Sequence, residues 1–137
     1  MKKVWNVLAL VGLVVAFTNC SGCCDKGPAA IEKSIYKELQ KGDYHQAAEL
    51  LVSNLDTSEE STAEEKEQTI QLFAEKAQSS MEAKGGIKSF EITEEAISED
   101  GLSAVVSTKV VYGDNTEKVE QTKYVNKDGV WKMSLNK

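Results

Sequence analysis

All three cysteines of this 137-residue chain lie within five residues, in the segment Cys20-Ser21-Gly22-Cys23-Cys24. Thiols this close together could bind a metal, form a redox pair, or carry an attached group. A structural zinc site needs four ligands, and the single histidine, His45, is distant in sequence. The Cys20-x-x-Cys23 spacing suits a thioredoxin-like motif only within a βαβ pattern, which the sequence does not show. These observations favour attachment, and we expect no metal site and no cofactor.

The residues before Cys20 have the pattern of an export signal. Lys2 and Lys3 precede an apolar run of 14 residues, Val4 to Phe17. A transmembrane helix needs about 20 residues, whereas a charged start followed by a short apolar run is typical of a secretory signal peptide. A cysteine then follows where a soluble secreted protein would show a cleavage site between small residues.

This start resembles the signal of bacterial lipoproteins, in which the cysteine after the apolar run receives a diacylglyceryl group and becomes the new N-terminus. The resemblance implies lipid attachment at Cys20, with Cys23 as the alternative because the small residues Ser21 and Gly22 precede it. It divides the chain into a signal peptide (1–19), a lipidated cysteine with its tether (20–27) and a folded domain (28–137). It also implies a bacterial cell envelope protein anchored to a membrane, with the outer membrane favoured and the domain in the periplasm or at the cell surface.

The charge of the chain argues against a nucleic-acid partner. Its net charge is -6, and all sixteen basic residues are lysines. Proteins that bind DNA or RNA usually carry a basic stripe with arginines that contact phosphates and bases. Removal of residues 1–19 would take away Lys2 and Lys3 and leave a net charge of -8. We therefore expect contact with the membrane through the lipid and not through surface charge.

Three helices are predicted after the tether. Pro28 suits the first position of a helix, and Gly42 ends that helix. Asp43 and Gln46 form a capping-box-like pair that opens a second helix. Thr62 and Glu65 form another, at the start of a longer helix that ends at about Lys84.

From residue 87 the apolar pattern has a period of two, which is typical of strands. Strands are predicted over about 87–97, 102–112 and 117–126, with a fourth around Trp131 and Met133. Short turns separate them, so we expect an antiparallel meander. Helices followed by strands predict an α+β domain with the helices on one sheet face.

This order resembles the nuclear-transport-factor-2-like (cystatin-like) cone fold, in which helices pack on a curved four-stranded antiparallel sheet. It is similar to small lipoproteins of Bacteroidota with a domain of unknown function, some of which are labelled lumazine-binding. The segments that carry the resemblance are LQKGDYHQAAELL (39–51), GGIKSFEI (85–92), EDGLSAVVSTKVVYGDN (99–115) and KDGVWKM (127–133). The resemblance implies a cavity between the helices and the concave sheet face.

No catalytic set is evident for that cavity. His45 is predicted at the surface, at the start of the second helix. Asp100, Asp114 and Asp128 lie in turns, where aspartate is favoured for its geometry. The candidate pocket-lining residues are instead largely apolar, and core packing is the more common role of such residues. They are Tyr112, Trp131, Phe90 and Val110.

These observations favour a noncatalytic envelope lipoprotein that binds a small ligand or a partner protein. One alternative is an isomerase- or hydrolase-like enzyme that uses an acid or a tyrosine in the cone. Another is a structural protein that forms a homodimer through the outer sheet face, where Val105 and Val111 interrupt the polar pattern.

Overall fold

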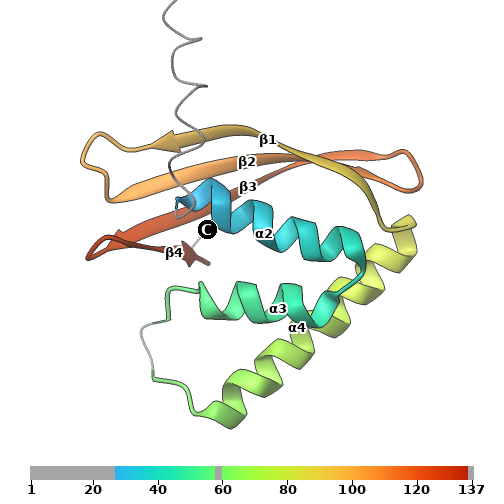
Figure 1. Ribbon diagram of the computed structural model, residues 1–137, viewed down its shortest axis with the longest axis horizontal. Coiled ribbons are helices and arrows are strands. Elements are labelled where there is room, and N and C mark those ends of the chain that lie inside the picture. The colour runs from blue at the N-terminus through green and yellow to red at the C-terminus, as the bar shows by residue number, and fades with distance from the viewer. Residues whose placement is uncertain (1–26, 58–59, 136–137) are drawn as a thin grey trace, which may run out of the picture.

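The computed structural model describes residues 27–57 and 60–135, and these form three helices followed by one four-stranded sheet (Figure 1). The predicted α+β order is therefore confirmed. The elements are α2 (Pro28–Lys41), α3 (Tyr44–Ser53), α4 (Ala63–Lys84), β1 (Ile87–Ile97), β2 (Ser103–Tyr112), β3 (Glu117–Lys127) and β4 (Val130–Ser134).

The predicted helix ends are confirmed by their capping geometry. Gly42 and Gly85 end α2 and α4 in the left-handed conformation, with φ of 83° and 78°. The Asp43 side chain accepts a hydrogen bond from the Gln46 amide at the start of α3. Thr62 and Glu65 form a full capping box on α4, in which each side chain bonds the other's backbone N–H. Local sequence alone therefore determines where these helices start and stop.

The sheet is an antiparallel meander in the order β1-β2-β3-β4. Its last turn has two central residues, Asp128 and Gly129, with φ of 54° and 83°, which suits a tight hairpin. Two register shifts interrupt the pairing of β1 with β2, between Ile87 and Ser89 and between Ile92 and Glu94. Such bulges bend and twist a strand, and they accompany the curl of the sheet.

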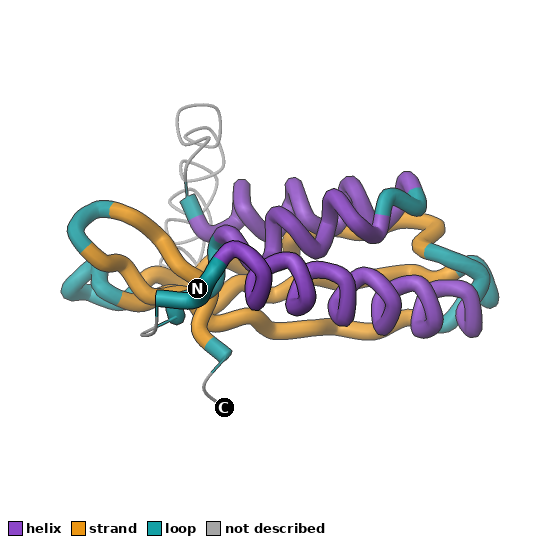
Figure 2. Tube along the Cα trace, turned by 90° about the horizontal axis from the view of Figure 1, so that it is seen from below, coloured by secondary structure: helices purple, strands orange, loops and turns teal. Residues whose placement is uncertain are grey.

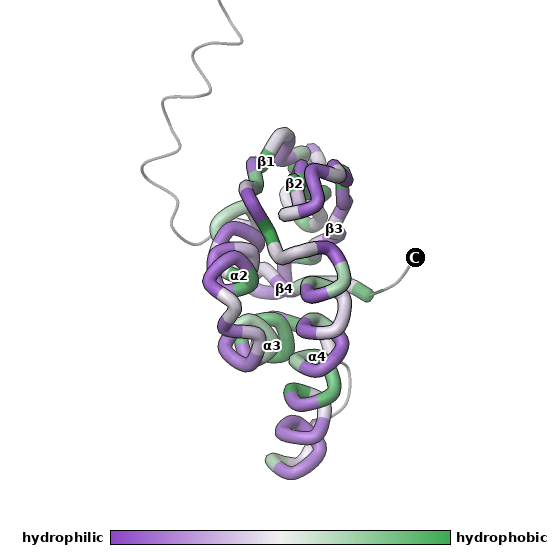
Figure 3. Tube along the Cα trace, turned by 90° about the vertical axis from the view of Figure 1, so that its right-hand side faces the viewer, coloured by the Kyte–Doolittle hydropathy of each residue, from purple (hydrophilic) through white to green (hydrophobic). Residues whose placement is uncertain are grey.

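Helix α2 lies on the concave face of this sheet, α3 packs on α2, and α4 packs on α3 (Figures 1 and 2). Two hydrogen bonds fix α2 to β1: the Ala29 amide donates to Glu95 Oε2 at 2.9 Å, and Gln40 Nε2 donates to the Lys88 carbonyl at 3.1 Å. The N-terminal part of α4 extends away from the sheet (Figure 3). The prediction that the helices lie on one sheet face holds, although α2 provides most of the direct cover.

Two clusters of buried side chains form the core. The first contains Ile35, Ala104, Val106, Tyr124 and Met133, and it takes in Leu55 from the segment after α3. The second contains Tyr36, Ile87, Val110 and Tyr112. Phe73 of α4 packs against the first cluster and Met81 against the second.

The predicted signal peptide (1–19) and the three cysteines that follow it, Cys20, Cys23 and Cys24, lie outside the described residues. Within the residues that are described, no helix is long and apolar enough to cross a membrane.

Candidate functional site

The four predicted pocket residues do not line one common space. Val110 is fully buried and Tyr112 is 3% exposed, both in the second cluster. Phe90 is half-buried and stacks on Tyr36, with ring centroids 5.6 Å apart. Trp131 packs against the first cluster instead. The structure therefore brings Phe90, Val110 and Tyr112 together and places Trp131 elsewhere, and their role as pocket residues stays a prediction.

At the centre of the cone lies a carboxylate, Glu32 of α2, which is 3% exposed. Tyr124 OH donates to Glu32 Oε2 at 2.5 Å. Thr122 Oγ1 donates to Oε1 at 2.9 Å, and Thr108 Oγ1 lies 3.5 Å from the same atom. Both carboxylate oxygens thus have hydroxyl donors from the concave face of the sheet, and no lysine among the described residues forms an ion pair with them.

Burial shifts the ionisation of this group. Burial raises the pKa of Glu32 above its usual range, because the charged form loses its hydration. The hydrogen bonds from Tyr124 and Thr122 lower that pKa, but the balance remains a raised value. Burial and the nearby Glu32 charge also raise the pKa of Tyr124, which keeps its phenol protonated as a donor.

A second tyrosine–glutamate pair lies one helical turn further along α2. Tyr36 OH donates to Glu120 Oε2 at 2.5 Å, and Lys118 Nζ lies 2.7 Å from Glu120 Oε1. Partial burial raises the pKa of Glu120, but the hydrogen bonds from Lys118 and Tyr36 and the charge of Lys118 together lower it below its usual range. The pKa of this glutamate is therefore shifted in the opposite direction to that of Glu32.

Sequence reasoning considered aspartates and His45 as bases and missed Glu32. A signal was present, because Glu32 lies between Ile31 and Ile35 on the face of α2 that carries the apolar residues. An acid at such a helical position faces the core. The hydroxyl groups that satisfy it come from residues 108, 122 and 124, and only the folded sheet brings these together.

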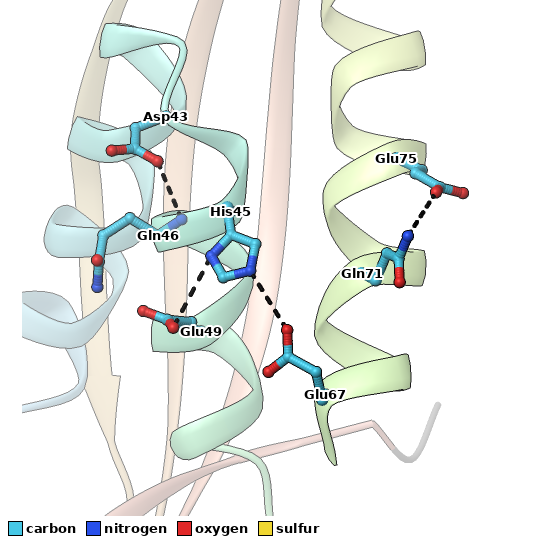
Figure 4. A network of polar contacts seen from close by, with 7 residues as sticks. All are labelled: Asp43, His45, Gln46, Glu49, Glu67, Gln71 and Glu75. Carbon is cyan, nitrogen blue, oxygen red and sulfur yellow. Dashed lines mark hydrogen bonds and ion pairs between the residues drawn. The ribbon is translucent and has the colours of Figure 1, made fainter. Parts of the chain in front are cut away.

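His45 is exposed at the surface, as the sequence predicts. Its ring lies between two carboxylates, 3.8 Å from Glu49 of α3 and 3.6 Å from Glu67 of α4 (Figure 4). The ring thus bridges α3 and α4 far from the cone. In the described part of the chain, no group of three or more histidine, cysteine, aspartate or glutamate side chains is placed to hold a metal ion.

The outer sheet face carries an open hollow of about 550 Å³ near the β1–β2 turn. One row of paired residues crosses all four strands there: Ala96, Val105, Lys123 and Ser134. Val125 adds a second valine beside Val105. Tyr124 also lines the hollow, although its side chain points into the buried core on the opposite face, where its hydroxyl binds Glu32. The site is therefore a shallow, largely apolar surface with a lysine at its centre.

The helices on the concave side of a curled antiparallel sheet define an NTF2-like α+β cone domain. The crystal structure of a Campylobacter jejuni protein, assigned as an NTF2-like transpeptidase, matches with a TM-score of 0.60. The two are 24% identical over 80% of this chain and 99% of that one.

The chain belongs to the family described as a domain of unknown function, DUF4878, whose model matches residues 21–134. The predicted likeness to an NTF2-like domain of unknown function is thereby confirmed. The closer likeness to Bacteroidota lipoproteins stays a prediction.

Two other solved structures are more distant. The intermembrane space region of chloroplast protein ARC6 matches with a TM-score of 0.37 and 15% identity, over 79% of this chain and 93% of that one. A Xanthomonas campestris domain, assigned as a calcium/calmodulin-dependent protein kinase II association domain, matches with a TM-score of 0.32 and 20% identity, over 77% and 79%. Both are too distant to inform on function. No curated protein matches the sequence.

Proposed function

We propose that this protein is a lipid-anchored protein of the bacterial cell envelope whose cone domain is a noncatalytic module that binds a partner protein. The observation that carries the proposal is the contrast between the two sheet faces. The concave face is filled by side chains, whereas the outer face carries an open hollow across all four strands.

The filled cone argues against a small ligand inside it. Val106, Thr108 and Val110 of β2 are each 0% exposed beneath the helices. Glu32 already has hydroxyl donors on both oxygens. A ligand would have to displace α2 and leave this carboxylate buried without its donors, which is costly.

The outer hollow has the composition of a protein-binding surface. Val105 and Val125 both line it, on the same face of two neighbouring strands. Ile97 and Leu102 at the adjacent turn are 49% and 58% exposed. Apolar residues that share a hollow are typical of the centre of an interface, and polar residues of its rim. Lys123 and Ser134 supply the polar groups.

The anchor would hold this surface near the membrane. The expected tether of seven residues, Ser21 to Gly27, spans at most about 25 Å when extended. A diacylated Cys20 provides the two chains that stable anchoring requires. The partner is accordingly expected in the same envelope compartment.

A photo-cross-linking amino acid at position 105, introduced into the chain in its native host, tests the proposal. We expect one discrete adduct. The control is position 94, which is exposed on the same outer face and lies outside the hollow. Equal adducts from both positions, or none from position 105, would contradict a partner at this hollow.

A second candidate is an isomerase- or hydrolase-like enzyme, and one observation favours it. The buried Glu32 has a raised pKa and accepts a hydrogen bond from Tyr124, a residue that also lines the outer hollow. Catalysis would require solvent and substrate to reach Glu32. Labelling of the folded protein with a water-soluble carbodiimide distinguishes the two functions. A noncatalytic module predicts an unlabelled Glu32 beside a labelled, exposed Glu91, whereas equal labelling would favour the enzyme.

A further inference from the structure

Strand β3 has one edge that is only half covered. It spans Glu117–Lys127, and β4 pairs with it only from Lys123 to Lys127. Among residues 27–57 and 60–135, no strand lies beside residues 117–122 on the side away from β2. An uncovered strand edge presents N–H and C=O groups in the geometry that pairs with another strand. Residues 117–122 are termed the open edge below.

The pairing pattern shows which backbone groups point outward. The Tyr112 amide bonds the Thr116 carbonyl across the β2–β3 turn. Hydrogen-bonded and non-bonded pairs alternate along an antiparallel ladder, so even-numbered residues of β3 bond to β2. Glu117, Val119 and Gln121 therefore direct their backbone groups away from β2. The β3–β4 hairpin agrees, because its two-residue turn closes on the odd-numbered Lys127.

The open edge carries charges of both signs, and most of its side chains are exposed. Val119 is 60% exposed on the outer face. Lys118 and Glu120 lie on the opposite face, with side chains 56% and 35% exposed. An edge with a central apolar residue between opposite charges can pair with a second copy of itself, depending on the register.

Three registers place a two-fold axis near the middle of the open edge. An axis at residue 118 puts Lys118 opposite Lys118, and an axis at residue 120 puts Glu120 opposite Glu120. An axis at Val119 puts Lys118 of each copy opposite Glu120 of the other, and Val119 opposite itself. Like charges directly opposite are destabilising and opposite charges are favourable. Only the register at Val119 has complementary charges, and it also lets the outward backbone groups of residues 117, 119 and 121 bond one another.

The free length of the edge suits this register. With the axis at Val119, residues 117–121 of the two copies pair with one another, and Thr116 of the other copy lies opposite Thr122. The pairing ends before Lys123, whose edge away from β2 is occupied by Ser134 of β4.

We propose that two copies of this protein pair antiparallel through the open edges of β3, with the two-fold axis at Val119, so that their sheets become continuous. This surface is separate from the outer hollow around Val105. The contact involves one short strand segment from each copy, so it is smaller than the interface of a stable dimer. We therefore expect an association that dissociates on dilution.

Reversal of the charges at positions 118 and 120, in full chains that carry two different tags, tests the register. Co-purified from membranes in mild detergent, wild-type chains should bind one another. Lys118→Glu chains and Glu120→Lys chains should each self-associate about tenfold less, because each places two like-charged pairs opposite one another. A mixture of the two variants restores both opposite-charge pairs and should recover wild-type binding. Because only folded chains can complement in this way, failure of the mixture to recover binding would overturn the register.

A cross-link provides the second measurement. Paired Cα atoms at an antiparallel hydrogen-bonded position lie about 5.5 Å apart, which a disulfide can bridge. Val119→Cys chains should therefore form a bond between the two positions 119, identified by peptide mass spectrometry and so distinguished from bonds of the native cysteines. Val125→Cys, on the same face where β4 covers the strand, should form none. No bond at 119 in folded chains, or equal bonds at 119 and 125, would overturn the proposal.

Discussion

The phenol of Tyr124 on β3 donates a hydrogen bond of 2.5 Å to Oε2 of Glu32 on α2, although 92 residues separate them in the sequence. This contact joins the first helix to the sheet in the centre of the cone. It also explains how a carboxylate can be 3% exposed when no lysine in the described part of the chain pairs with it.

The two glutamates of the cone predict opposite effects of pH on stability. The folded pKa of Glu32 is raised above its ordinary value of 4.5, so its contribution to folding is fully present below that value and is lost as the pH rises through the folded pKa. Glu32→Gln does not titrate, so the variant should gain stability relative to wild type between pH 4 and pH 7. Urea unfolding at both pH values measures this difference.

Glu120 is the matched comparison. Its folded pKa is lowered, so its contribution is present above 4.5 and is lost as the pH falls. Glu120→Gln should therefore lose stability relative to wild type over the same rise in pH. The same sign for both variants would show that burial does not dominate the ionisation of Glu32.

Removal of the Tyr124 hydroxyl should destabilise the domain. Tyr124→Phe leaves one buried oxygen of Glu32 without its donor, which costs about 1–3 kcal/mol. The cost should shrink in the Glu32→Gln background, because a neutral amide loses less hydration than a carboxylate. A double-mutant cycle by urea unfolding measures this coupling. Additive effects would contradict the direct contact.

Gly113 should tolerate no side chain. A Cβ at this position would collide with the carbonyl of Gly85, where the α4–β1 junction meets the β2–β3 turn. The Gly113 amide also bonds the Gly86 carbonyl at 2.8 Å. Gly113→Ala should therefore lower the free energy of unfolding by more than about 2 kcal/mol.

Gly101→Ala is the control for this position. A Cβ on Gly101 meets nothing within 4 Å, and only its φ of 69° opposes a side chain. That strain costs about 1 kcal/mol. Equal losses in the free energy of unfolding at positions 101 and 113 would show that the α4–β1 junction moves to accommodate the added methyl group.

The anchor is tested by mass spectrometry of the mature chain. The resemblance to lipoprotein signals predicts a diacylglyceryl group on Cys20 as the first residue. Cys20→Ala should remove the lipid and release the protein from the membrane fraction. Lipid that persists on Cys23 in this variant would place the attachment there, and an unlipidated wild-type chain would contradict the anchor altogether.

The order and ends of the elements were determined by local sequence. Gly42, Asp43, Thr62 and Gly85 each act on their own turn of backbone, and the period of two after residue 87 marks the strands. Such signals need no knowledge of distant residues, so the α+β order could be predicted. The observed strand bounds differ little from the predicted ones: β2 begins at Ser103, one residue after the predicted start at residue 102.

Tertiary structure decided what surrounds each side chain. Glu32 was visible as an acid on an apolar helix face, but its donors lie 76, 90 and 92 residues away. Phe90, Val110 and Tyr112 were expected to share a pocket with Trp131, yet they pack in a different cluster. Solvent exposure and pKa depend on contacts between distant segments, and curvature and register set those contacts. The sequence therefore determined which residues form the cone, and only the folded sheet decided that a buried carboxylate would lie within it.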